Sequence, residues 1–549
     1  MLTPEQIEAV RLQAEELTRP VVEFLIEDIA RRISEAGQLT STAQYQIWRA
    51  QNLGLSQKEI QNRLKKLLNV SEQQIKDLLT QTAKVGYRFD LSRLPTVDAI
   101  PFEENTVIQQ IVSAAVELAQ ADFSNITQTL GFVNQDGVCR PLTDAWLQAC
   151  DFAFEKVATG AEDMNSAVRK ATKYLADKGI RTIDYESGVH RSIEAATRGC
   201  VMGGLGLMQE KISQYNHDEL GANGWEISAH AASAPDHEPI QGKQYSDEEY
   251  EKLNNALARR IGTLNCGHAA FPVILGVSKP QYTDAELEQF KQDNAKGIDY
   301  EGQHYSMYEA TQQQRKLERT MRKQKNRILV DETNGDKEKL QVDQIRLRRI
   351  SEEYNRFSKA AGLRTQPHRA QVAGFGVKQA GAAQAAAQRH HTEWLHSIGA
   401  ENSELKKLDK YYEAKYNNSP AYQLLMGYRK AVDKGDISPL VGIEEYIKVA
   451  NNIQAEIIGQ TTSTGITIES YATHFIDRVI GQTSEAHEGK RCGVSIENVL
   501  DALLNPIELK PSREFPDGDI RQNFVGKKAK VTISIRDKRL IQTNPWKGG

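Results

Sequence analysis

Residues 305–330 read YSMYEATQQQRKLERTMRKQKNRILV, and this basic run decides how the middle of the chain folds. It opens a helical pattern that extends from Tyr300 to about Gly362, as one long helix or as a helical hairpin. The sequence DETNGDKEK favours the hairpin, because Asn334-Gly335 is a turn signal. The helical pattern then resumes through LQVDQIRLRRISEEYNRF, residues 340–357.

Residues 1–130 also predict helices. Apolar residues recur at helical spacing from Ile7 to Ile33, behind a start at Thr3-Pro4, where threonine can cap the helix and proline fits its first turn. Two further helix starts are expected, a capping-box pattern at Ser56 and a similar start at Ser71. This region is therefore predicted to contain short helices joined by polar turns.

The helical pattern continues beyond residue 140, over the ranges 142–157, 164–178 and 189–211. The last of these ranges contains three closely spaced glycines, Gly203, Gly204 and Gly206. Glycine in a helix costs about 1 kcal/mol relative to alanine. Three together therefore predict either a close backbone approach or a break in the helix.

The last third of the chain changes character. Residues 363–440 contain KQAGAAQAAAQRHH, which is interpreted as a linker, with an alanine-rich helix as the alternative. One helix is expected over 466–479 and another over 499–504. Strand-like runs follow at 523–526, 529–535 and 539–543. The tail is therefore predicted to be a small α+β unit.

The chain has 549 residues, which is too long for one hydrophobic core, since cores stop growing near ~250–300 residues. We expect a multidomain, mainly α protein with helical N-terminal and central regions and a small C-terminal α+β domain. Four regions are predicted: a helical N-terminal region at 1–130, a central module at 131–362, a linker and helical connector at 363–440, and the tail domain at 441–549.

Composition limits the functional classes. The hydrophobic fraction of 39% excludes wholesale disorder, and the net charge of −4 argues against a surface that coats nucleic acid throughout, although local basic patches stay open. No stretch approaches the ~20 apolar residues of a membrane span. The N-terminal residues MLTPEQIEAV do not resemble a signal peptide. The five cysteines are dispersed without a CxxC pair, a pattern that does not make a disulfide framework.

Several segments resemble the phage minor capsid protein 2 family, in the order in which the family has them. They are ISAHAASAPDHEPIQGKQYS, LNCGHAAFPVILGVS, YEGQHYSMYEATQQQRKLERTMRKQKNR and AAGLRTQPHRAQVAGFG. The resemblance covers roughly residues 1–370 and is most specific between 225 and 330. One departure is Ala234, where the family usually has arginine. The resemblance implies a head protein of tailed phages or prophages, related in outline to Mu-type head-morphogenesis proteins that lie at or near the portal.

The tail is similar to a second group, the phage-borne nuclease-like domains of the barnase, EndoU, colicin E5/D and RelE fold group. The matching segments are THFIDRVIGQ, VSIENVLDALLNP and RLIQTNP. This resemblance implies an endoribonuclease that uses no metal. A base activates the 2′-hydroxyl, an acid protonates the leaving 5′-oxygen, and a cation stabilises the phosphorane.

In the tail, the candidate catalytic residues follow from that resemblance. His474 and Arg478 are four residues apart and share one helix face. Thr543, near the end of the last strand, is the expected hydroxyl partner, and Arg491 and Arg521 are candidate phosphate-holding cations. The alternative is a structural histidine with surface arginines, in a domain that persists only as a binding module.

Histidine, cysteine and aspartate gather in one place, between residues 221 and 280, within a segment that otherwise looks like loop. The candidate zinc ligands are His230, His237, Cys266 and His268, because imidazole and thiolate are the ligands that zinc prefers. Asp236 is placed to orient His237. The alternative is a hydrogen-bonded loop cluster that packs on Trp225, with no metal.

The basic run of the central helix could contact packaged DNA, because clustered cations neutralise phosphates without reading sequence. The candidate residues are Arg315, Lys316, Arg319, Arg322, Lys323 and Arg327. The alternative is a solvated helix face whose cations pair with glutamates.

No Walker loop and no G-x-S-x-G elbow occurs, so neither a packaging motor nor a serine hydrolase is predicted. The expected function is structural: assembly of a phage head at or near the portal, with the portal protein and the major capsid protein as partners. The protein is expected in the host cytoplasm during assembly and then in the virion. Two alternatives stay open, a virion-carried ribonuclease that acts on RNA and an internal protein that organises packaged DNA.

Overall fold

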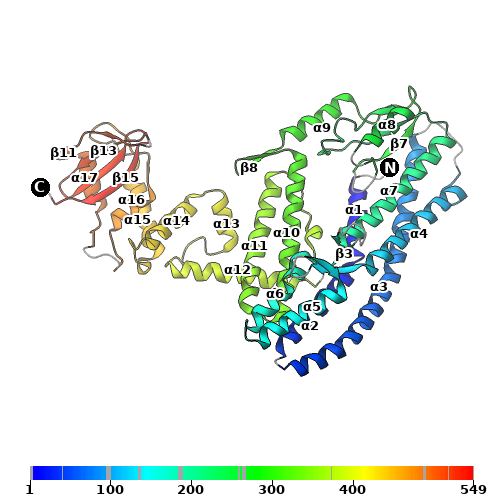
Figure 1. The fold of residues 1–549 in the computed structure, drawn as a ribbon. Coiled ribbons are helices and arrows are strands. Elements are labelled where there is room, and N and C mark those ends of the chain that lie inside the picture. The colour runs from blue at the N-terminus through cyan, green and yellow to red at the C-terminus, as the bar shows by residue number, and fades with distance from the viewer. Residues whose placement is uncertain are drawn as a thin grey trace. The chain divides into compact units, whose positions relative to one another are not determined.

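The computed structural model describes residues 4–39, 41–93, 100–133, 138–183, 190–257, 260–262, 267–372, 374–485, 490–516 and 518–547. Within these ranges the chain forms two compact units, Met1–Ala383 and Gln384–Gly549, which we describe one at a time (Figure 1). The division between them falls inside helix α12 (Val377–Ser397).

The first unit is mainly helical, as the sequence predicts. Its helices are α1 (Pro4–Glu16), α2 (Arg19–Gln38), α3 (Thr42–Arg93), α4 (Thr106–Gln128), α5 (Leu142–Ala158), α6 (Met164–Lys178), α7 (Ile193–Glu219), α8 (Asp247–Ala256), α9 (Asp284–Lys296), α10 (Met307–Asn334), α11 (Lys337–Ala360) and the 3-10 helix η1 (Pro367–Ala370). The predicted helices at 142–157 and 164–178 are confirmed as α5 and α6.

Small antiparallel sheets lie between these helices. One has the strand order β2-β1-β3-β4, another β6-β5-β7, and β8 pairs with β9 alone. The strands are β1 (Leu130–Val133), β2 (Cys139–Pro141), β3 (Arg181–Ile183), β4 (His190–Ser192), β5 (Gly224–Ile227), β6 (Gln244–Ser246), β7 (Ala270–Val273), β8 (Ile298–Tyr300) and β9 (Gln303–Tyr305). The sequence did not predict them, because strands of three or four residues carry too little alternation to stand out.

Helix α3 runs unbroken for 52 residues, so the helix starts predicted at Ser56 and Ser71 are wrong. The hydroxyl of Ser71 donates to the carbonyl of Leu17 (3.2 Å) instead of capping a helix. The two ends of α3 belong to different hydrophobic cores. Tyr45 packs in a core with α2, α5 and α6, and Leu79 packs in a core with α1, α4 and α7. Tertiary packing of this kind outweighs local capping signals.

The glycine cluster lies in α7, which continues through it. Gly204 faces α4, and a Cβ atom at this position would lie 3.2 Å from the Cβ of Ala119. A Cβ at Gly203 would meet no other atom within 4 Å. Of the two predicted explanations for the cluster, the structure therefore shows a close approach, at Gly204, and no break.

Helices α10 and α11 form the hairpin that the sequence predicts, and they run side by side (Figure 1). Ser306 and Glu309 form a capping box at the start of α10. The hairpin turns at Gly335, whose φ of +71° is a conformation that glycine adopts without strain. The side chain of Asp336 then caps α11 by accepting from the backbone of Lys339.

The second unit combines helices with one mixed sheet. After α12 its helices are α13 (Leu408–Tyr416), α14 (Pro420–Asp433), η2 (Pro439–Val441), α15 (Gly442–Glu456), α16 (Thr473–Ile480) and α17 (Ile496–Leu504). Its strands are β10 (Ser470–Tyr471), β11 (Glu508–Leu509), β12 (Arg513–Glu514), β13 (Ile520–Val525), β14 (Ala529–Ser534) and β15 (Arg539–Pro545). The sheet order is β10-β15-β14-β13-β11, and β12 also pairs with β13.

The strand-like runs predicted near the C-terminus are confirmed as β13, β14 and β15. The helix predicted at 466–479 is shorter, because β10 occupies Ser470–Tyr471 and α16 begins only at Thr473. The linker interpretation of 363–440 is wrong for residues 384–440. The alanine-rich segment forms α12, and one core joins Leu395 and Tyr428 to Phe475 and Phe524.

Among the described residues, no helix has the length and apolar character that crossing a bilayer requires.

The contrast between Gly204 and Gly203 makes a paired prediction. Gly204→Leu should lower the free energy of unfolding by about 1–3 kcal/mol, because the new side chain must displace α4. Gly203→Leu should be neutral or slightly stabilising, because leucine is the better helix former and the space is open. Thermal unfolding followed by circular dichroism compares the two. Equal destabilisation by both variants would contradict the packing described for α4 and α7.

Candidate functional site

Helix α16 and strand β15 carry several of the candidate catalytic residues of the C-terminal domain. The helix packs on the strand through Phe475 and Ile476, which are fully buried, and this leaves His474 exposed and Arg478 half-buried. The Nη1 atom of Arg478 donates to Oδ1 of Asn544 on β15 (3.3 Å). The predicted pair therefore shares the outer side of α16, next to the end of β15.

His474 lies in a strongly basic environment. Although its ring is exposed, the surrounding chain desolvates it enough to lower the pKa of the imidazole, and four neighbouring cations lower that pKa further. These cations are Arg478, Arg539, Lys434 and Lys430. His474 is therefore mainly neutral near pH 7, and a neutral imidazole can accept a proton.

Arg491 has unsatisfied hydrogen-bond donors beside this pair. Its Nε and Nη2 atoms are buried and have no hydrogen-bond partner in the structure. The backbone N–H of Arg491 donates to Oε1 of Gln482 (2.9 Å), and this hydrogen bond holds Arg491 near the end of α16. Burial lowers the pKa of Arg491, and the charge of Arg478 lowers it further. The charges of Asp436 and Asp477 raise that pKa and offset part of this effect. Two guanidinium groups, one of them with unused donors, are still groups that can bind an anion.

Thr543 does not take the role predicted for it. Its side chain is fully buried, and its hydroxyl donates to the carbonyl of Lys530 (3.3 Å). The reason is an irregularity in the pairing of β14 with β15, which shifts the register between Thr532 and Ile533. The extra residue reverses which side chains of β15 face the core. Asn544, which the sequence analysis did not single out, contacts Arg478 instead.

Arg521 is also separate from the histidine. It lies on β13, two strands from β15, and forms an ion pair with Asp519 at 2.6 Å. Its guanidinium also lies over the ring of Phe515 (4.3 Å). Arg478 therefore lies near both His474 and Arg491, whereas Thr543 is buried and Arg521 lies two strands away. Lys430 and Lys434, which complete the basic surroundings, lie in the region interpreted as a connector, where no motif marked them.

Three of the four zinc candidates gather beside the β6-β5-β7 sheet. The ring of His268 lies 4.3 Å from that of His230 and 5.1 Å from that of His237, between ring centroids. His237 and His268 are buried, and Asp236 Oδ2 lies 3.8 Å from His237 Nε2. The fourth candidate, Cys266, lies outside the described residues.

Hydrogen bonds account for part of this cluster. His230 Nδ1 lies 2.9 Å from the carbonyl of Ala231, so Nδ1 carries the proton, and its Nε2 is buried without a partner. His268 Nε2 lies 2.9 Å from Oε1 of Gln241. Burial lowers the pKa of His268 to about 2, and the two neighbouring imidazoles contribute. Trp225, the expected packing partner, stacks on His217.

Among the described side chains, this cluster does not by itself form a complete metal site. No group of three or more possible metal ligands comes together among the described residues. The Nε2 atom of His268 already has a hydrogen-bond partner, Gln241. A zinc site here would therefore need Cys266 as a further ligand. The unpartnered Nε2 of His230 is the atom that such a site would use first.

Metal analysis of the purified chain separates the two interpretations. The zinc hypothesis predicts about one zinc per chain and a melting temperature that falls when a chelator removes the metal. Cys266→Ser should reproduce that fall, whereas Cys492→Ser, an exposed free cysteine elsewhere, should not. Zinc-free protein whose melting is indifferent to chelator would leave a purely hydrogen-bonded histidine cluster.

The basic residues of α10 do not form one exposed face. Lys316 and Arg319 are exposed, whereas Arg315, Arg322, Lys323 and Arg327 are half-buried. Arg327 and Lys323 both reach Asp177 of α6, at 2.5 and 3.5 Å. Burial opposes the ionisation of Asp177, but these two cations outweigh it and lower its pKa. Two of the six cations predicted to contact DNA, Lys323 and Arg327, therefore form ion pairs inside the first unit.

Comparison with known proteins gives one match. A family model described as phage minor capsid protein 2 matches residues 2–358, and neither a curated protein nor a solved structure matches the chain. The matched residues contain the whole α10–α11 hairpin and the histidine cluster, apart from the last two residues of α11. The chain therefore belongs to the phage minor capsid protein 2 family.

Proposed function

We propose that this capsid protein acts at or near the portal of a phage head, and that its second compact unit cleaves RNA. Membership of a minor capsid family makes the chain a structural protein of the virion that associates with other capsid proteins. The family match ends at residue 358, before the division at 383 and 384. The second unit is thus a separate body with its own core, which supports a separate activity for it.

The portal assignment concerns the first unit. Helices α3, α4 and α7 expose large apolar side chains, among them Ile47, Leu118 and Leu207. Such residues on a helical surface suit contact with other capsid proteins, of which the portal protein and the major capsid protein are the proposed partners.

Particle composition tests the portal assignment. The protein should be present in DNA-free heads together with the portal protein, because its place does not require packaged DNA. Heads assembled without portal protein should contain the major capsid protein but lack this chain, as measured by quantitative mass spectrometry. Equal incorporation with and without portal protein would contradict the assignment.

The observation that supports RNA cleavage is the gathering of His474, Arg478 and Arg491. Neutral His474 would take the proton of a ribose 2′-hydroxyl, whose oxygen then attacks the adjacent phosphorus. The 5′-oxygen leaves with a proton from the protonated histidine or from water, and a 2′,3′-cyclic phosphate remains. The guanidinium groups of Arg478 and Arg491 would stabilise the extra negative charge of the phosphorane, since charged donors stabilise developing charge most effectively in a partly buried site.

An assay on the full-length chain with single-stranded RNA tests this activity. Wild-type protein should produce fragments with 2′,3′-cyclic ends, and His474→Ala should abolish cleavage. Arg491→Gln should lower kcat by about 100-fold or more, as loss of a transition-state donor does. Arg521→Gln, the matched arginine on β13, should leave kcat unchanged. Intact RNA after incubation with folded wild-type protein refutes the proposal.

The pH dependence of kcat/KM gives a second test, because it would not change if His474 had only a structural role. The lowered pKa of His474 places the acid limb of kcat/KM below the ordinary histidine pKa of about 6.5. Replacing Lys430 and Lys434 with glutamine removes two repelling charges, so the imidazole pKa rises and the acid limb moves to higher pH. An unmoved acid limb in this double variant would show that His474 is not the titrating base.

A further inference from the structure

A cleft of about 230 Å³ lies in the first unit, between α1, α2, α10 and the segment around η1. Cationic and imidazole side chains from separate parts of the chain line it: Arg19, Arg181, Arg319, Arg322, Lys323 and His368. Three of them belong to the run of α10 that the sequence analysis expected on an exposed DNA-binding face. The structure turns this part of the run toward the cleft.

The acidic residues that line the same cleft are already engaged. Glu16 pairs with Arg19, and Glu15 accepts from Arg198 at 2.5 Å. The third, Asp177, is shared by Lys323 and Arg327. The cleft therefore has more positive charge than its own carboxylates offset.

The remaining α10 arginines of the cleft lack such partners. Arg319 has no ion-pair partner among the described residues. Arg322 donates only to a neutral acceptor, the carbonyl of Arg369, at 2.5 Å. His368 has a buried Nε2 atom without a hydrogen-bond partner. Arg319 and Arg322 therefore form no ion pair among the described residues, and His368 has a ring nitrogen that no described residue contacts by a hydrogen bond.

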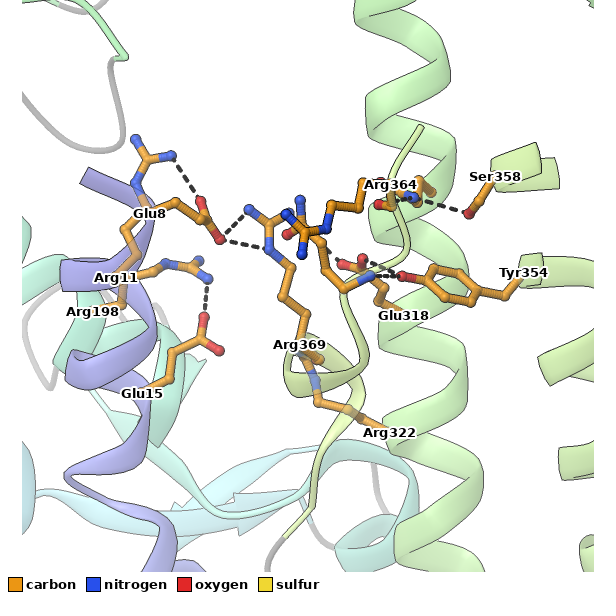
Figure 2. Close-up of polar contacts among 12 residues, drawn as sticks. Glu8, Arg11, Glu15, Arg198, Glu318, Arg322, Tyr354, Ser358, Arg364 and Arg369 are labelled. Atoms are coloured by element: carbon orange, nitrogen blue, oxygen red, sulfur yellow. Dashed lines mark hydrogen bonds and ion pairs between the residues drawn. The ribbon is translucent and has the colours of Figure 1, made fainter. Parts of the chain in front are cut away.

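Further arginines lie near the cleft, between α1 and α10, without lining it. Figure 2 shows Arg369 between α1 and α10, where its guanidinium meets Glu8 (2.7 Å). Burial lowers the pKa of Arg315, and the nearby charges of Arg369 and Arg11 lower it further. The Nε atom of Arg315 is buried and has no partner. Glu8 and Glu318 offset part of this positive charge, because Arg369 forms ion pairs with both carboxylates.

We propose that this cleft binds a phosphate group. A phosphate presents several acceptor oxygens and up to two negative charges, which matches guanidinium forks arriving from different elements better than a single carboxylate does. The volume suits one phosphate or a pyrophosphate, not a base-paired duplex, so a nucleic acid could enter only by its backbone. The group could come from packaged DNA or from a free phosphate compound. This site is independent of the RNA cleavage proposed for the second unit.

Calorimetric titration of the full-length chain with sodium pyrophosphate, at constant ionic strength, tests the proposal. Wild-type protein should bind pyrophosphate, and Arg319→Gln and Arg322→Gln should each weaken binding about tenfold, since each removes a charged donor. Lys316→Gln is the matched control, because Lys316 is exposed on the same helix but does not line the cleft. Arg319 is exposed, so its variant should melt like the wild type and report on binding alone.

Competition with a short DNA duplex identifies the source of the phosphate. If DNA binds and pyrophosphate displaces it, the cleft receives backbone phosphates, and Arg319→Gln should reduce the slope of binding against salt by about one. If pyrophosphate binds and DNA does not, the ligand is a free phosphate compound. Absence of pyrophosphate binding, or binding that Lys316→Gln weakens as much as Arg319→Gln does, overturns the proposal.

Discussion

Burial of a basic helix is the constraint on which the first unit depends. Helix α10 packs against α2, α6 and α11, and this packing places several of its basic side chains inside the unit. A buried charge is costly unless it is paired, and several of the half-buried cations have acceptors inside the unit. Asp177, the carbonyl of Arg369 and the carbonyl of Ala370, which accepts from Lys325 at 2.6 Å, serve this purpose. The positions of α6 and of the segment around η1 are thereby tied to α10.

The sequence predicted the parts of the fold whose signals are local. Asn334-Gly335 marked the turn of the hairpin because the glycine there adopts a positive φ. The alternation of apolar and polar residues marked β14, although both faces of that strand are largely buried. The starts at Ser56 and Ser71 failed because packing at both ends of α3 decides its continuity. The short strands β5, β6 and β7 were missed because their burial depends on distant partners.

The candidate site of the tail shows the same limit. Spacing on one helix predicted that His474 and Arg478 act together, and the structure places them so. It could not predict that one extra residue in β15 would bury Thr543 and turn Asn544 toward Arg478, because a bulge is visible only in the pairing of two strands. Nor could it predict Lys430 and Lys434, since repulsion at His474 depends on α14 packing against α16.

The length of α3 has a mechanical consequence. At 1.5 Å per residue its 52 residues extend about 78 Å, and its ends are anchored in two different cores. A helix of this kind resists stretching, since lengthening it breaks backbone hydrogen bonds. A compressive force on the core around Tyr45 is therefore transmitted along α3 to the core around Leu79, unless the helix bends or unfolds between them.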